Sequence, residues 1–95
     1  MELNTAFGLI LRQARKVAGK TQEDFSEVSG RTYLSALERG LQSPTLEKLD
    51  DLSRSLQIHP VSLLAASYLI KDCMPVDDLL IILKRDLRAL GVEGI

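Results

Sequence analysis

Hydrophobic positions recur along the whole chain at the three- and four-residue spacings of amphipathic helices. The first such stretch covers residues 6–18 and predicts a core helix. Asn4 or Thr5 is expected as its N-cap, because short polar side chains accept hydrogen bonds from the exposed amides of a first turn. Gly19 is expected to end this helix.

Two shorter helices follow, joined by a turn that contains glycine. Thr21 is expected to cap a helix over residues 22–28, with Phe25 and Val28 turned inward. The next helix is predicted over residues 31–39, and the glycine after it is a typical helix end.

The second half of the chain predicts three more helices. Ser43-Pro44-Thr45 opens the fourth, and Pro60 opens the fifth, which continues to about residue 70. The sixth is predicted over residues 76–90. The fourth helix carries leucines at spacings of three, three and four, all expected to face the core: Leu46, Leu49, Leu52 and Leu56.

The sixth helix has more apolar surface than a solvated tail needs. Its apolar stripe, of heptad spacing, consists of Val76, Leu79, Leu80, Leu83, Leu87 and Leu90. Two arrangements bury it: the helix pairs with the same helix of a second copy, or it folds back onto its own domain. We favour dimerisation, because five preceding helices already supply a full core.

Composition indicates the fold class, and the charge bears on whether the chain binds nucleic acid. The chain has 95 residues, of which 45% are hydrophobic and only 4% aromatic, so aliphatic side chains must fill one compact core and an all-α fold is expected. The formal net charge of −1 argues mildly against nucleic acid binding. Basic residues are concentrated between residues 12 and 39, however, so either one face is basic or the surface is an ordinary mixture.

Reactive side chains are scarce. Cys73 is the single cysteine, which excludes an intramolecular disulfide and a structural zinc site, and it is expected to pack. His59 is the single histidine and is expected to cap a helix or to pack. We therefore expect no enzyme, no metal and no cofactor. Without a secretion-like or membrane-spanning apolar run, the expected setting is cytoplasmic and nucleoid-associated, with no membrane partner.

Residues 21–40 have the pattern of a helix-turn-helix, whose second helix enters the major groove of DNA. Such a motif needs an apolar underside and a polar upper face. The underside is supplied by Phe25, Val28, Leu34 and Leu37. The upper face is supplied by Gln22, Arg31, Thr32, Ser35 and Arg39.

Three stretches make this pattern specific: TQEDF at 21–25, RTYLSALERG at 31–40 and SPTLEKL at 43–49. In this order they resemble the XRE family, the phage-repressor-like regulators related to lambda repressor and Cro, over about residues 7–64. The resemblance implies a five-helix lambda-repressor-like domain that binds palindromic operators as a dimer.

The resemblance also implies base contacts at the start of the recognition helix. Arg31 would take guanine O6 and N7 together, and Thr32 would place its methyl group against thymine. Gln22 would touch a phosphate or an adenine, or it is simply an exposed residue at a helix start. Contacts at Tyr33, Ser35 and Ala36 are less specific. The Tyr33 side chain either reaches a phosphate or packs beside the preceding helix.

Arg39, Gln42 and Ser43 follow the recognition helix in a loop, where such residues hold phosphates without reading sequence. Glu38 differs, because the resemblance pairs it with Arg15 in a structural ion pair.

This chain departs from the family pattern in two places. The segment between Phe25 and Arg31 is about two residues shorter than usual, and Lys20 stands where an apolar residue often precedes Thr-Gln. The sequence therefore does not determine the geometry of the turn, and the register of the base-reading residues could shift by one position.

We expect a sequence-specific DNA-binding transcription regulator that acts as a repressor and binds an inverted-repeat operator as a homodimer. Residues 1–70 would form the DNA-binding domain and residues 71–95 the dimerisation element. The alternative is a protein-interaction module of the antitoxin or anti-regulator type, with a protein partner and with DNA binding secondary or lost. The low net charge and the short turn favour this alternative slightly, whereas Gln22, Arg31 and Arg39 on the exposed face favour DNA binding.

Overall fold

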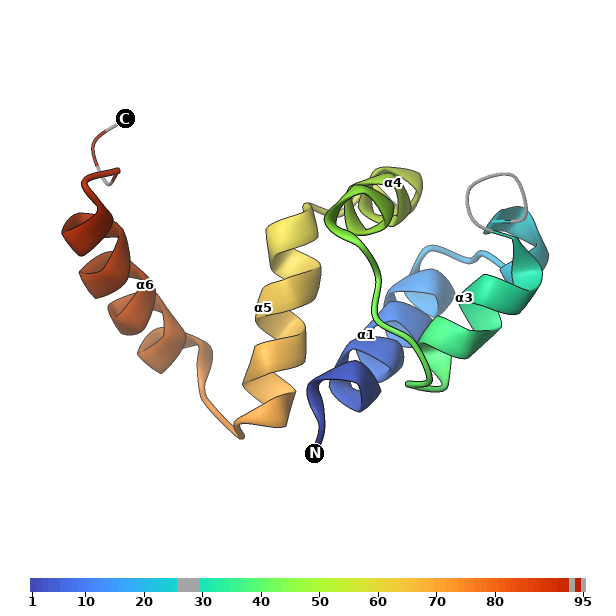
Figure 1. Cartoon of the computed structure of the whole chain (residues 1–95), viewed down its shortest axis with the longest axis horizontal. Helices are drawn as coiled ribbons and strands as arrows, with labels where there is room; N and C mark the ends of the chain where they lie inside the picture. The colour runs from blue at the N-terminus through green and yellow to red at the C-terminus, as the bar shows by residue number, and fades with distance from the viewer. Residues whose placement is uncertain (26–29, 93, 95) are drawn as a thin grey trace.

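The computed structural model describes residues 1–25, 30–92 and 94. These residues form α-helices and one 3-10 helix, arranged as in Figure 1. In chain order the elements are α1 (Leu3–Val17), η1 (Gln22–Phe25), α3 (Arg31–Glu38), α4 (Leu46–Leu56), α5 (Pro60–Lys71) and α6 (Val76–Leu90). The described ranges contain no strand, and the all-α prediction is confirmed.

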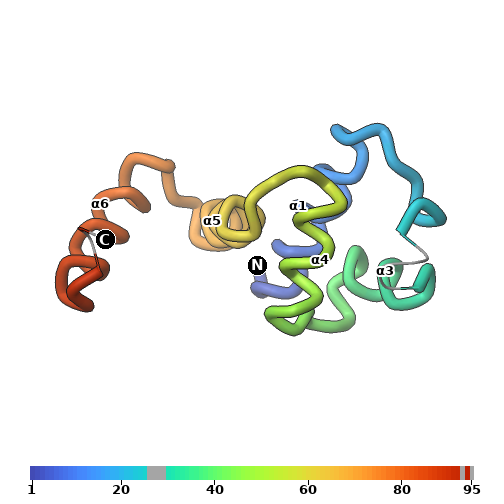
Figure 2. Tube along the Cα trace, turned by 90° about the horizontal axis from the view of Figure 1, so that it is seen from above, coloured from blue at the N-terminus to red at the C-terminus, as the bar shows by residue number. Residues whose placement is uncertain are grey.

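One hydrophobic core joins every element except α6. Its buried side chains are Phe7, Leu11, Phe25, Leu34, Leu37, Leu49, Leu52, Leu56 and Leu63. Seen from above, α5 separates α6 from α1, α3 and α4 (Figure 2). The described side chains of α6 are all at least partly exposed, so the core is complete without them.

The N-terminus of α1 begins earlier than the sequence indicated. Glu2 is the N-cap residue, and its carbonyl oxygen accepts a hydrogen bond from the Ala6 N–H at 3.0 Å. The prediction of Asn4 or Thr5 as N-cap is wrong, because the Asn4 side-chain oxygen instead accepts a 2.7 Å hydrogen bond from the Ser43 hydroxyl. The extra turn brings Leu3 to an apolar groove that Phe7 also lines.

The helix-turn-helix region is described in part. Of the helix predicted over 22–28, residues 22–25 form the 3-10 turn η1, whereas the rest of it, including Val28, lies outside the described residues. Thr21 stands at the start of this turn, where its N–H donates to Asp24 Oδ2 at 2.7 Å and its carbonyl accepts from the Asp24 N–H at 3.2 Å. After α3, Gly40 adopts a φ of 76°, the left-handed conformation that ends a helix.

α4 begins as expected, with the Thr45 hydroxyl accepting a 3.1 Å hydrogen bond from the Lys48 N–H. Leu49, Leu52 and Leu56 are buried in the core. The prediction for Leu46 is wrong, because its side chain is 81% exposed. Leu46 is the first residue of α4 and lines the apolar groove with most of its surface in solvent.

The turns before and after α5 are formed in different ways. Pro60 is the first residue of α5, and His59 Nδ1 caps the helix by accepting from the Val61 N–H at 3.0 Å. Beyond the C-terminus of α5, Cys73 has a φ of 50° and is exposed, so the prediction that it packs is wrong. The turn it occupies sends α6 away from the core (Figure 1).

α6 has the predicted bounds and leans on α5 through a shared apolar groove. Leu79 and Leu83 line this groove together with α5 side chains such as Leu64 and Tyr68. In the described part of the chain, no helix combines the length and the apolarity that crossing a membrane requires.

Candidate nucleic-acid interface

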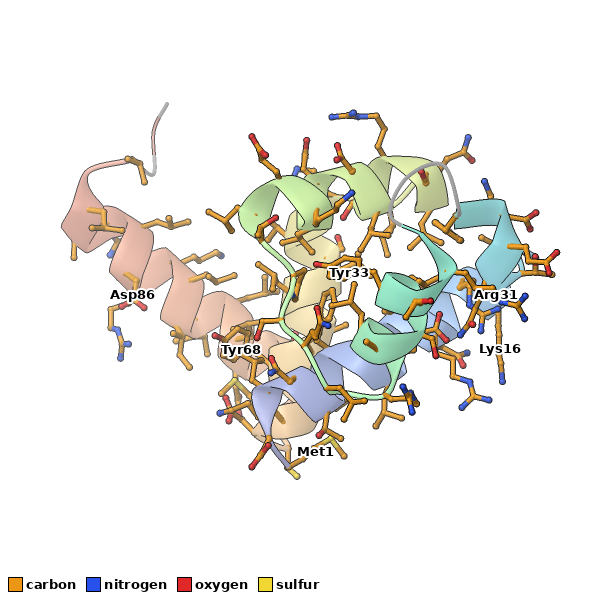
Figure 3. The ribbon with its side chains drawn as sticks, turned by 45° about the vertical axis from the view of Figure 1, so that its right-hand side comes forward. Met1, Lys16, Arg31, Tyr33, Tyr68 and Asp86 are labelled. Atoms are coloured by element: carbon orange, nitrogen blue, oxygen red, sulfur yellow. The ribbon has the colours of Figure 1, made fainter. Side chains whose placement is uncertain are left out.

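α3 is fixed on its inner face and open on its outer face. Leu34 and Leu37 are fully buried, whereas Arg31 and Thr32, in the first turn, are exposed. Figure 3 shows Arg31 at the outer edge of the molecule, on the same side as Lys16. A helix held in this way can present its N-terminal side chains to the major groove of DNA without exposing its apolar face.

The other predicted contact residues of α3 are less accessible. Tyr33 is half-buried and its ring packs against the core, pointing from α3 toward the middle of the molecule (Figure 3). Ser35 is also half-buried. Ala36 is only 7% exposed, so it belongs to the inner face and its methyl group is not presented to solvent.

Arg15 and Glu38 form a two-point ion pair between α1 and α3. Arg15 Nε donates to Glu38 Oε2 at 2.7 Å and Nη2 donates to Oε1 at 3.0 Å. The two side chains are 13% and 4% exposed. The hydrogen bond with Glu38 raises the pKa of Arg15, against the opposing effect of burial and with help from the charge of Glu38. The two residues that the family resemblance pairs are therefore in contact in the structure.

The same arginine and glutamate also hold the turn that leads into η1. Arg15 Nη1 donates to the Lys20 carbonyl oxygen at 3.0 Å. Gln22 Nε2 donates to Glu38 Oε1 at 3.2 Å, so the Gln22 amide is already engaged within the protein. No described residue bonds to its second N–H or its side-chain carbonyl oxygen, and these groups suit a phosphate or a base.

Sequence reasoning missed one contact of Arg31. Its Nη1 atom lies 3.0 Å from Glu23 Oε1 on η1, and both side chains are largely exposed, at 66% and 73%. An acid and a base eight positions apart on either side of a turn are not signalled by sequence spacing, because the turn geometry decides whether they meet.

The loop after α3 is tied to α1. Arg39 and Gln42 are exposed, while the Ser43 hydroxyl is used by Asn4. A Cβ atom on Gly40 would lie 3.1 Å from the Thr5 Cα, and the φ of 76° is strained for other residues, so glycine favours this close approach of the loop to α1. The loop is thereby held beside the C-terminal end of α3.

Within the described ranges, His, Cys, Asp and Glu side chains form no group of three that could hold a metal ion. The candidate site is the exposed first turn of α3 with the loop that follows it.

Comparison with known proteins agrees with this geometry. The family model for the helix-turn-helix matches residues 11–63, which is more than half of the chain. The chain belongs to the XRE-type helix-turn-helix family, and it is a DNA-binding transcription regulator.

The chain is similar to two individual proteins that are described as regulators. An uncharacterised HTH-type transcriptional regulator of Sinorhizobium fredii, y4dJ, is 35% identical over 65 residues, which are 66% of this chain and 84% of the relative. The crystal structure of the clp gene regulator ClgR from Corynebacterium glutamicum superposes with a TM-score of 0.68 at 26% identity. That match covers 98% of both chains, so it extends beyond the helix-turn-helix to α6.

Proposed function

We propose that this regulator is a repressor that binds an inverted-repeat operator as a homodimer. The observation that carries the proposal is the first turn of α3, which exposes Arg31 and Thr32 above a fixed, buried underside. The residues that would read bases are Arg31, which matches guanine O6 and N7, and Thr32, whose methyl group matches thymine. Ala36 is left out of this contact set because it is buried.

Contacts with the phosphate backbone would flank the base readers. Arg39 and Gln42 are exposed in the loop after α3, and their polar groups suit phosphate oxygens. Ser43 donates its hydroxyl to Asn4, so its backbone N–H is the group expected to meet a phosphate. Gln22 is expected at the edge of the groove, and Tyr33 and Ser35 contribute at most their polar tips. These contacts would set the register of the protein on DNA without selecting a sequence.

The proposed dimer is built by residues 71–95, whereas residues 1–70 form the DNA-binding domain. Leu79 and Leu83 of the apolar stripe are half-buried beside α5, and the remaining stripe residues are exposed: Val76, Leu80, Leu87 and Leu90. Pairing this stripe with the same helix of a second copy would remove it from water. A twofold dimer would then place two copies of α3 in successive major grooves, about 34 Å apart.

Repression would follow if the operator overlaps a promoter, because the bound dimer would block the polymerase. A second candidate function, a protein-interaction module with a protein partner, draws support from the formal net charge of −1. The two candidates differ in what they predict for Arg31→Ala, because only the operator-binding candidate expects this substitution to change DNA binding.

Selection of DNA fragments by the purified full-length chain tests the proposal. We expect enrichment of an inverted repeat whose affinity falls as salt rises. Arg31→Ala should relax the preference at one position of each half-site and cost about 1–3 kcal/mol per contact. Arg85→Ala is the matched control, because Arg85 is an exposed arginine on α6 paired with Asp86. Absence of enrichment at low salt would reject operator binding and favour the protein-interaction module.

A further inference from the structure

The contact between Glu23 and Arg31 lies where the proposed function places the contacts with DNA bases. Among the described residues, Arg31 bonds only to Glu23, through Nη1 and Oε1 at 3.0 Å. A guanidinium carries five N–H donors in a planar fork, so no described residue occupies the edge formed by Nε and Nη2. That free edge is the kind of surface that matches guanine O6 and N7.

The backbone that carries Glu23 is held on both sides. Before it, the Gln22 amide is bonded to the buried Glu38 carboxylate. After it, the Asp24 carboxylate accepts from the Thr21 N–H at 2.7 Å, and Phe25 is buried in the core. Glu23 is thus an exposed carboxylate on an anchored turn, and its partner is an arginine on an anchored helix.

We propose that Glu23 is a positioning residue that sets the base specificity of Arg31. This inference rests on the proposed operator binding and adds one residue to it. By holding Nη1, the carboxylate limits the rotation of the guanidinium and orients its free edge toward the groove. Its negative charge also opposes approach to a phosphate, so Arg31 is withheld from sequence-independent contacts.

The substitution Glu23→Gln separates this role from a general charge effect. It keeps the size of the side chain and removes the charge that holds the guanidinium. We expect the affinity for a scrambled duplex to rise and the affinity for the selected operator to rise less or to fall. The ratio of the two affinities should drop roughly two- to fivefold, since an exposed charged pair carries at most this much coupling. On the scrambled duplex the slope of log affinity against log salt should steepen by about one, because Arg31 gains a phosphate.

Two controls make the test decisive. Asp50→Asn breaks an exposed ion pair with Arg54 of 2.8 Å on α4 and should leave the ratio unchanged. In an Arg31→Ala background, Glu23→Gln should no longer alter the ratio, because the residue it positions is gone. Circular dichroism spectra should be identical for all variants.

The outcomes are distinguishable. An equal change in both affinities, or the same change in ratio with and without Arg31, would overturn the positioning role and leave operator binding intact. Failure of the unaltered chain to prefer any duplex would overturn the proposed function, and the role of Glu23 with it. A drop in the affinity ratio that depends on Arg31 supports both the positioning role of Glu23 and operator binding.

Discussion

Gly8 lies where α1 approaches the C-terminal end of α3. A Cβ atom at this position would lie 2.6 Å from the carbonyl oxygens of Leu37 and Glu38, and both of these are backbone atoms. In an ordinary helix, replacing glycine by alanine stabilises the fold by about 0.5–1 kcal/mol. Here the sign should reverse, because α1 and α3 would have to move apart.

We expect Gly8→Ala to lower the free energy of unfolding by about 1–3 kcal/mol, the usual cost of overpacking. Urea denaturation followed by circular dichroism measures this. Gln13→Ala, on the exposed side of the same helix, should change the stability by less than about 0.5 kcal/mol. If Gly8→Ala were more stable than the unaltered chain, the close approach of the two helices would be wrong.

Whether a residue's role could be predicted depended on how local that role is. Arg31, Thr32 and Arg39 were predicted on the exposed face because helical spacing separates an inner from an outer side, and the structure places them there. Gly8 gave no signal, since its role depends on a helix that crosses it about thirty positions later in the chain. The Glu23 contact was missed because the geometry of a turn decides whether two residues eight positions apart meet.

At the scale of elements, the Arg15–Glu38 pair fastens α1 to α3. It is largely buried, and the amide of Gln22 shares its carboxylate. Removing one partner strands the other charge, so Glu38→Gln and Arg15→Met should each cost about 3–5 kcal/mol. The double variant should lose less than the sum of the two, because neither charge is left alone.

A double-mutant cycle of unfolding free energies measures this coupling. The exposed Asp50–Arg54 pair of α4 provides the comparison, with an expected coupling of about 0–1 kcal/mol. Strictly additive losses for Arg15 and Glu38 would show that the ion pair does not fasten the two helices in solution.

Element boundaries followed the sequence wherever the signal was local. α4 begins after the Thr45 cap, and α5 begins at Pro60, because capping groups and proline act within one turn. The start of α1 was misplaced, since Asn4 bonds to Ser43, a residue 39 positions away. Leu46 was misplaced because spacing defines a helix face but not how far along that face the neighbouring helices reach.

At the scale of the whole molecule, the chain measures 41 × 29 × 22 Å along its principal axes, and α6 lies beyond α5 at one end of the view in Figure 1. The core draws its side chains from residues up to Leu63. The candidate DNA-binding surface on α3 and the apolar stripe of α6 therefore occupy different parts of the molecule. This separation lets one surface be altered without unfolding the other.

Leu80 and Leu87 offer the sharpest test of what the stripe does, because both are exposed and neither belongs to the core. We expect the double substitution Leu80→Glu and Leu87→Glu to yield a folded monomer, since like charges would face each other in the pairing of two α6 helices. Light scattering after size-exclusion chromatography measures the mass, and circular dichroism checks the helical content.

The same double variant should bind an isolated half-site like the unaltered chain, because α3 is untouched. It should lose the gain in affinity that a second linked half-site provides. Arg85→Glu, on α6 but outside the stripe, should leave both the mass and the operator affinity nearly unchanged. A doubly substituted chain that keeps the mass of a dimer would move the interface away from α6. It would then leave the exposed leucines to a partner other than a second copy, which is the feature that distinguishes a protein-interaction module from a self-paired repressor.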